Sequence, residues 1–179
     1  MFYGDVYGSF GPRRAVGRAE GTLELPPHHA AVVRMVLARR LFAYGAQTEY
    51  FADDRLCVGF TRRGRPGGGP GLAVLMSAVA CGCEGEYLGS EAGAWCKSNI
   101  KTKRMYVGAE HAGERWTDIL GASQEGGKGG PGYGCGHDND TAVVIDELGW
   151  ATFSVGPRRV SVWVDEAAEG RDVLDGFKL

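Results

Sequence analysis

Acidic residues that could act in pairs occur at three places in the chain: Asp53 with Asp54, Asp138 with Asp140, and Asp146 with Glu147. Acid–base catalysis by two carboxylates requires both groups to be held a few ångströms apart on rigid elements. Each pair lies instead in a segment typical of a turn or a glycine-rich loop, where Asp is favoured because it hydrogen-bonds to nearby backbone. We therefore expect solvated turn carboxylates and predict no catalytic residue in this chain.

Thiol and imidazole groups are the next candidates, because together they can bind zinc. The possible ligands are Cys81, Cys83, Cys96, Cys135 and His137. A single residue between the first two cysteines is fewer than in the usual C-x-x-C knuckle, and the other ligands would come from separate irregular segments. The five cysteines, Cys57 included, are an odd number without a regular framework, which also disfavours a disulfide-stapled fold. Free thiols are the favoured interpretation, and zinc binding stays open as an alternative.

Isolated histidines and aromatic residues give weaker signals. His28, His29 and His111 have no nucleophile nearby in sequence, so we expect them at the surface. The aromatic residues that could stack on sugar rings are Trp116, Trp150 and Trp163, together with Tyr106. Such residues in strands more often pack in a core or across strands. The three tryptophans are therefore candidates for substrate binding only under a minor hypothesis, that of a carbohydrate-binding module.

Charge and hydropathy narrow the classes of partner. The 20 basic and 22 acidic residues give a net charge of -2, which provides no electrostatic reason to expect nucleic acid or an anionic membrane. Residues 1–14 lack the apolar core of a signal peptide, and no stretch has the length needed to span a bilayer. The compartment stays unknown, with the cytoplasm favoured.

The elements that must position these side chains are one helix and many short strands. Residues 26–44 carry apolar side chains at helical spacing, namely Val33, Val36, Leu37 and Leu41. This stripe needs a partner, and little sequence precedes it that could provide one. Strand-like alternation and turn residues then predict strands at 56–62, 72–77, 104–107, 115–119, 141–145, 151–155 and 160–164. The pattern indicates a mainly β, antiparallel Greek-key sandwich preceded by one helix.

Two long segments interrupt this pattern, at 78–102 and 123–140, and neither shows a helix or strand period. Compact domains rarely contain structureless loops of this length, so we interpret both as insertions. The predicted organisation is thus a helical segment at 1–45, a β-sandwich at 46–164 with these two insertions, and a charged tail at 165–179 that is frayed or weakly helical.

Several short strings resemble, in order, the C-terminal end of α-amylases of glycoside hydrolase family 13, the liquefying bacterial enzymes and their intracellular relatives. They are Phe2-Tyr3-Gly4-Asp5, Ala38-Arg39-Arg40, Ala43-Tyr44-Gly45, Val58-Gly59-Phe60, Leu72-Ala73-Val74-Leu75, Lys103-Arg104-Met105-Tyr106-Val107-Gly108, Trp116-Thr117-Asp118, Gly149-Trp150 and Val160-Ser161-Val162-Trp163-Val164. Each string is weak alone, but their common order over residues 2–164 makes the resemblance specific.

The resemblance implies the C-terminal part of a starch hydrolase. Residues 1–45 would be the last strand and helix of its catalytic (β/α)8 barrel, and the rest would be the domain that follows the barrel. The family's three catalytic acids precede the string at Phe2, so none has a counterpart here, and Met1 falls at a position internal to the family. The resemblance thus implies a truncated chain, inactive alone, whose partners are the catalytic barrel and, through it, an α-glucan. The segment 78–102 has no counterpart in the family, and a retained intron would explain it.

Calcium is the cofactor that the resemblance implies for the whole enzyme. In liquefying amylases a His-Asp pair before the strand matching Val58 helps to bind it. This chain has Asp53 and Asp54 there, in a stretch one residue longer, and two carboxylates are too few oxygens for a firm calcium site. We therefore predict no metal in this chain and name these two residues only as candidates.

Overall fold

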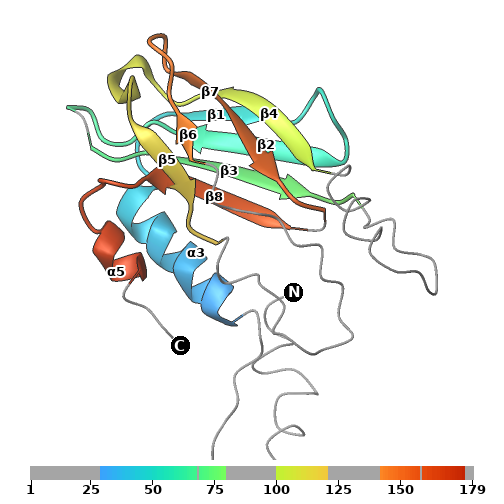
Figure 1. Ribbon diagram of the computed structural model, residues 1–179, viewed down its shortest axis with the longest axis horizontal. Helices are drawn as coiled ribbons and strands as arrows, with labels where there is room; N and C mark the ends of the chain where they lie inside the picture. The colour runs from blue at the N-terminus through green and yellow to red at the C-terminus, as the bar shows by residue number, and fades with distance from the viewer. Residues whose placement is uncertain (1–28, 68, 80–99, 121–141, 158, 176–179) are drawn as a thin grey trace, which may run out of the picture.

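A computed structural model of the chain describes residues 29–67, 69–79, 100–120, 142–157 and 159–175 (Figure 1). The elements in chain order are α3 (His29–Phe42), β1 (Gln47–Tyr50), β2 (Cys57–Arg62), β3 (Leu72–Ser77), β4 (Lys101–Tyr106), η1 (Ala109–His111), β5 (Arg115–Asp118), β6 (Val143–Val144), β7 (Trp150–Val155), β8 (Val160–Asp165) and α5 (Arg171–Asp175). No helix within these ranges is long and apolar enough to cross a lipid bilayer.

The strands form two antiparallel sheets. The larger sheet has the order β1-β2-β3-β8-β5-β6, and the smaller one consists of β4 and β7. The pairing of β3 with β8 joins strands far apart in sequence, because β4 and β7 lie between them in the chain and belong to the other sheet. The predicted antiparallel β-sandwich preceded by a helix is confirmed.

The core of the sandwich follows from the alternation of side chains along each strand. On β7, Ala151, Phe153 and Val155 are buried whereas Thr152 is exposed, so one face of this strand points inward. Two tryptophans of the large sheet meet that face: the ring centroid of Phe153 lies 6.0 Å from that of Trp116 and 5.8 Å from that of Trp163. Both tryptophans are at most 2% exposed, which makes them the centre of the core between the sheets.

The other face of the large sheet is covered by α3 and α5. Figure 1 shows α3 on the side of this sheet opposite to β4 and β7. Ala31, Ala38 and Phe42 are buried against the outward side chains of β3 and β8, among them Val74 and Val162. The three helical residues share one face because they are seven and four positions apart.

The helix therefore packs on a sheet that follows it in this chain, whereas from the sequence we considered only the preceding residues as its partner. The inward residues are also different from the predicted stripe. Val36 is 53% exposed and Val33 is half-buried, while Leu41 contacts the segment before α5 at Gly170. Apolar residues occur on both sides of this helix, and the sheet covers one side only.

Three predicted boundaries need correction. β1 was not predicted, and β4 begins at Lys101, inside the segment interpreted as an insertion at 78–102. The charged tail contributes Asp165 to β8 and forms the short helix α5. The second predicted insertion, at 123–140, lies outside the described residues, as do 1–28 and most of the first.

Candidate functional site

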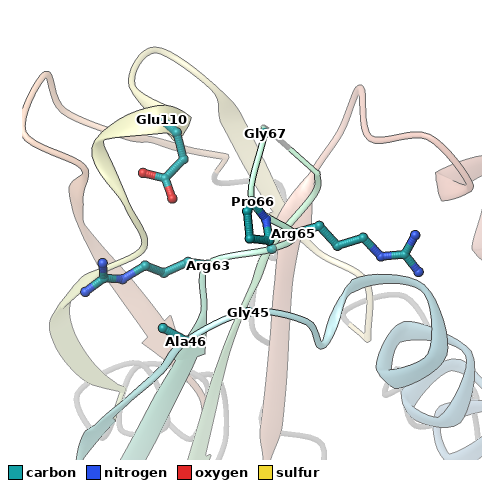
Figure 2. A pocket seen from close by; sticks show the side chains of 8 residues that line it. Gly45, Ala46, Arg63, Arg65, Pro66, Gly67 and Glu110 are labelled. Carbon is teal, nitrogen blue, oxygen red and sulfur yellow. The ribbon is translucent and has the colours of Figure 1, made fainter.

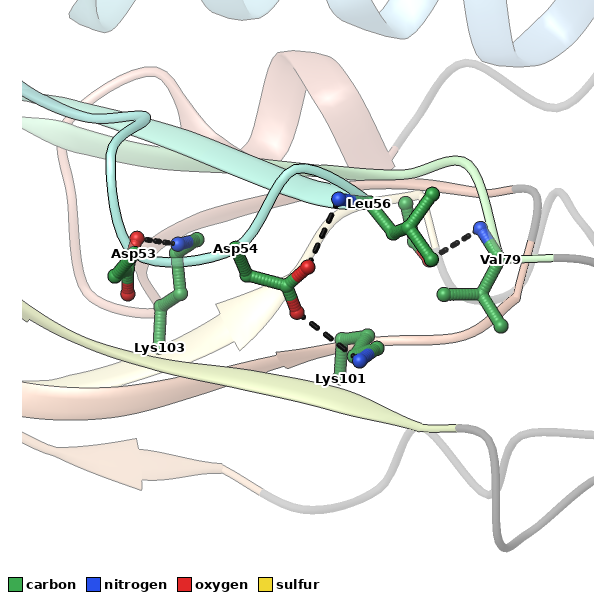
Figure 3. A network of polar contacts seen from close by, with 7 residues as sticks. Asp53, Asp54, Leu56, Val79, Lys101 and Lys103 are labelled. Carbon is green, nitrogen blue, oxygen red and sulfur yellow. Dashed lines mark hydrogen bonds and ion pairs between the residues drawn. The ribbon is translucent and has the colours of Figure 1, made fainter.

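The candidate calcium ligands Asp53 and Asp54 lie in the turn between β1 and β2, where Figure 3 shows both carboxylates bound to lysines of β4. The Asp54 carboxylate accepts a hydrogen bond from the backbone N–H of Leu56 at 2.8 Å and pairs with Lys101 at 3.0 Å. Asp53 pairs with the amine of Lys103, a side chain that is only 3% exposed. The bond from Lys103 lowers the pKa of Asp53, and the Leu56 N–H lowers that of Asp54.

These contacts do not fit a calcium site. Ca²⁺ needs six to eight oxygen ligands, whereas two ammonium groups already neutralise both carboxylates here. Within the described ranges, no three His, Cys, Asp or Glu side chains gather as a metal site would require. The possible zinc ligands Cys81, Cys83, Cys96, Cys135 and His137 lie outside the described residues, and Cys57 is a buried free thiol.

Asp146 and Glu147 form the predicted hairpin turn before β7. The Asp146 carboxylate accepts hydrogen bonds from the backbone N–H groups of Leu148 and Trp150, both at 2.9 Å, and the Trp150 N–H lowers the pKa of this carboxyl. Gly149 has a φ of 82°, and a Cβ there would lie 2.3 Å from the backbone carbon of Gly108. Asp146 is thus a structural turn residue, as expected. The pair Asp138 and Asp140 lies outside the described residues.

His111 is 1% exposed, so our expectation of a surface residue was wrong. Its Nδ1 lies 2.9 Å from Glu114 Oε2, and its Nε2 lies 2.8 Å from the carbonyl oxygen of Arg63. The same carboxylate oxygen accepts a hydrogen bond from Trp116 Nε1 at 2.8 Å. A doubly protonated ring would donate a hydrogen bond at both nitrogens in this arrangement. Burial acts to lower the pKa of His111, but the bonds to Glu114 and Arg63 raise it overall.

The sequence offered a partial signal for this cluster. His111 and Glu114 are three residues apart in a turn, which is compatible with contact, but Arg63 is 48 residues away in the chain. Its carbonyl oxygen is brought to the imidazole only by the fold. The cluster therefore fixes the β2–β3 connection to the start of β5, and no nucleophile among the described residues contacts the ring.

The tryptophans divide into two kinds. Trp116 and Trp163 are 0% and 2% exposed in the core between the sheets, so their rings are not open to a sugar. Trp150 is half-buried at the start of β7, next to Tyr106 at a centroid distance of 5.3 Å. Trp150 is thus the one of the three with a ring at the surface.

Among the hollows at the surface of the described part of the chain, two bear on function. The first, of about 520 Å³, is lined by backbone at Gly45 and Gly67 and by the side chains of Arg63 and Glu110 (Figure 2). The second, of about 410 Å³, runs beside α3 over the large sheet and is lined mainly by apolar residues such as Met35, Phe60 and Met76. Met76 is 37% exposed in this groove.

The described residues define a β-sandwich domain that has one helical layer and no arranged pair of catalytic carboxylates. Compared with known proteins, the chain is 33% identical over 92% of its length to the α-amylase of Bacillus licheniformis and 32% identical over 93% to the cytoplasmic α-amylase of Escherichia coli K12. It is also 29% identical over 93% to the glucan 1,4-alpha-maltohexaosidase of Bacillus sp. strain 707.

The chain spans about a quarter of the length of these relatives, between 23% and 26%. No family model matches it. The resemblance to α-amylases stated from the short strings is confirmed, and together with the mainly β fold it is consistent with the C-terminal domain of an α-amylase.

Proposed function

We propose that this chain is the non-catalytic C-terminal domain of an α-1,4-glucan hydrolase and that it packs on the catalytic (β/α)8 barrel of that enzyme. The main support for this proposal is that the similarity to α-amylases covers nine-tenths of this chain but only about a quarter of the length of those enzymes. The acidic residues support a structural role, because Asp53, Asp54 and Asp146 are each bound in turns. The starch or glycogen substrate would be cleaved by the barrel.

The surface proposed for the barrel is the outward side of α3 with the apolar groove beside it. Val36 of α3 and Val173 of α5 are 53% and 47% exposed, and Met76 lies in the groove that α3 lines through Met35 and Ala38. Exposed apolar groups that adjoin one another mark interaction surfaces more often than scattered ones do. In the family that this chain resembles, the helix matching α3 is the last helix of the barrel, so this side is the one that would meet the other barrel helices.

The proposal assigns no calcium ligand to Asp53 and Asp54. Calcium is implied for the whole enzyme by the resemblance alone, and the lysine partners of both carboxylates leave no room for it at this turn. Any calcium bound by the whole enzyme would take its ligands from other residues.

The test is binding of the full chain to the remainder of the barrel, expressed separately as the part of the Bacillus licheniformis α-amylase that this chain does not match. We expect a one-to-one complex in analytical ultracentrifugation. Val36→Glu should abolish the complex without unfolding the chain, because Val36 is exposed. Val144→Glu is the matched control, since Val144 is 63% exposed at the β6 edge, away from α3. A barrel that is folded by circular dichroism yet does not associate with the wild-type chain would overturn the proposal.

A further inference from the structure

The outer face of the β4–β7 pair carries three planar side chains in a row, and a fourth, that of Arg63, reaches the row from the β2–β3 connection. Antiparallel pairing places Tyr106 directly opposite Trp150, and the alternation of the strand puts Arg104 on the same side as Tyr106. The Arg104 guanidinium lies 5.3 Å from the centre of the Trp150 ring, and that of Arg63 lies 4.6 Å from the centre of the Tyr106 ring. The order is thus Arg63, Tyr106, Trp150, Arg104, which we call the Arg–aromatic row.

This row is not part of the core. Its inward neighbours Met105 and Ala151 are buried, whereas Tyr106 and Trp150 are half-buried and the Arg104 side chain is 63% exposed. Outward positions of a sandwich strand are usually polar, because they face water. Two adjacent half-buried aromatic rings on such a face, each with a guanidinium group over it, form a strip of mixed apolar and polar character at the surface.

Polar groups border the row at both ends. At one end the Arg63 side chain enters the hollow of about 520 Å³, where Figure 2 shows Glu110 on the opposite wall. The Nε of Arg63 is buried and has no hydrogen-bond partner within the described residues. At the other end Arg104 pairs with Asp146 at 3.1 Å.

We propose that the Arg–aromatic row and the hollow at Arg63 form a surface binding site for an α-1,4-glucan chain. A pyranose ring has an apolar face that can lie along the part of this strip that the rings leave exposed, and its hydroxyl groups can bind the guanidinium and carboxylate groups that border it. The mixed charges of Arg63, Glu110, Arg104 and Asp146 suit a neutral polyhydroxyl ligand better than a polyanion. The choice of an α-glucan rests on the proposed function, because that enzyme's substrate is of this class.

The site is separate from the surface proposed for the barrel. The row lies on the outer face of the small sheet, while α3 covers the far face of the large sheet. A bound glucan chain and a docked barrel would therefore not compete. The site would hold the enzyme on a starch granule or a glycogen particle while the barrel cleaves chains elsewhere.

The test is affinity electrophoresis of the full chain in native gels containing soluble starch, with maltoheptaose titrated by calorimetry. We expect retardation of the wild-type chain. Trp150→Ala and Arg63→Met should each weaken binding at least about tenfold, as loss of a central aromatic or arginine anchor does in other interfaces. Trp150→Phe should retain part of the affinity. The matched control is Leu148→Ala in the adjoining turn, 70% exposed, which should bind like the wild type.

Several outcomes would contradict the proposed glucan-binding site. They are a wild-type chain that is not retarded, equal retardation in gels of a β-linked glucan, and unchanged binding by a folded Arg63→Met variant. If Trp150→Ala fails to fold, the half-buried Arg63 decides alone, with circular dichroism as the check that Arg63→Met is folded. Failure of this site is distinguishable from failure of the proposed function by two variants. Val36→Glu should abolish binding to the barrel but keep starch binding. Arg63→Met should weaken starch binding but keep binding to the barrel.

Discussion

The two faces of the large sheet are covered to different degrees. Its inner face meets β4 and β7 and encloses an aromatic core in which Trp116, Phe153 and Trp163 are all at most 2% exposed. Among the described residues, its outer face meets α3 and the short α5, which leave an apolar groove of about 410 Å³ and an outward aliphatic side chain at Val36. In this part of the chain the inner face is thus closed, and the helical side keeps exposed apolar surface.

The largest expected loss of stability comes from a substitution in the core at the inner face of the large sheet. Trp116→Ala removes a fully buried ring and should destabilise the chain by about 3–5 kcal/mol, because a cavity remains among rigid neighbours. Trp150→Ala on the outer face should cost roughly 1–2 kcal/mol, since that ring is only half-buried. Urea unfolding followed by far-ultraviolet circular dichroism measures both. Equal losses for the two variants would contradict the difference between inner and outer tryptophans.

The next effect concerns the buried cluster that joins the β2–β3 connection to β5. The folded pKa of His111 is raised above its ordinary value of 6.5, so its stabilisation is complete below pH 6.5 and is lost as the pH rises through the folded pKa. Burial acts to raise the pKa of Glu114, but its bonds to His111 and Trp116 lower it below 4.5 overall. The stabilisation by Glu114 is therefore present above pH 4.5 and is lost as the pH falls through the lowered value.

The cluster should accordingly stabilise the fold most between pH 4.5 and 6.5. His111→Gln should flatten the decline in stability above pH 6.5 and cost about 1–3 kcal/mol at pH 6 by leaving a buried acceptor unpaired. Thermal melts across this range measure both effects. Glu110 and Asp165, the other acidic groups near His111, are unchanged in this variant, so the difference between the two melting curves reports on His111. A wild-type chain whose stability does not fall on the alkaline side would rule out a buried imidazolium.

A smaller effect is expected on the helical face. Met76→Ser in the apolar groove should change the stability of the isolated chain by no more than about 0.5 kcal/mol, because Met76 is already 37% exposed. The same substitution should weaken the complex with the barrel. A loss of several kcal/mol in the isolated chain would mean that the groove is covered by this chain itself.

No effect is expected from calcium. Since Lys101 and Lys103 neutralise Asp54 and Asp53, millimolar Ca²⁺ should leave the melting temperature of the isolated chain equal to that in a chelator. Asp53→Asn provides the comparison, because it removes one carboxylate while keeping the turn. A calcium-dependent rise that this variant abolishes would restore Asp53 as a ligand.

Local signals were sufficient for most of the strands. β3 was predicted at its observed bounds, Leu72–Ser77, because an apolar run between turn residues needs no distant information. β1 was missed because its four residues, from Gln47 to Tyr50, are mostly polar and are ordered by pairing with β2. The start of β4 was missed for a similar reason, since its buried residue Lys103 is charged and its partner Asp53 lies fifty residues away.

The helix face and the His111 cluster required the tertiary fold. Apolar residues surround much of α3, so the pattern alone favoured Val33 and Val36 over the smaller Ala31 and Ala38 that the sheet covers. His111 was assigned to the surface because neither the Arg63 carbonyl nor the surrounding core is apparent from neighbouring residues. The short strings in family order were enough to predict the similarity to α-amylases. The Arg–aromatic row could not be predicted, because it depends on the register between β4 and β7.

The central claim is that this chain is the non-catalytic domain of a starch-cleaving enzyme. The most direct measurement is the release of reducing sugar from soluble starch by the purified 179-residue chain, with the Bacillus licheniformis α-amylase as positive control. The account predicts no release above a blank preparation. Release that rises with the amount of purified chain would contradict it and would require catalytic groups within these residues.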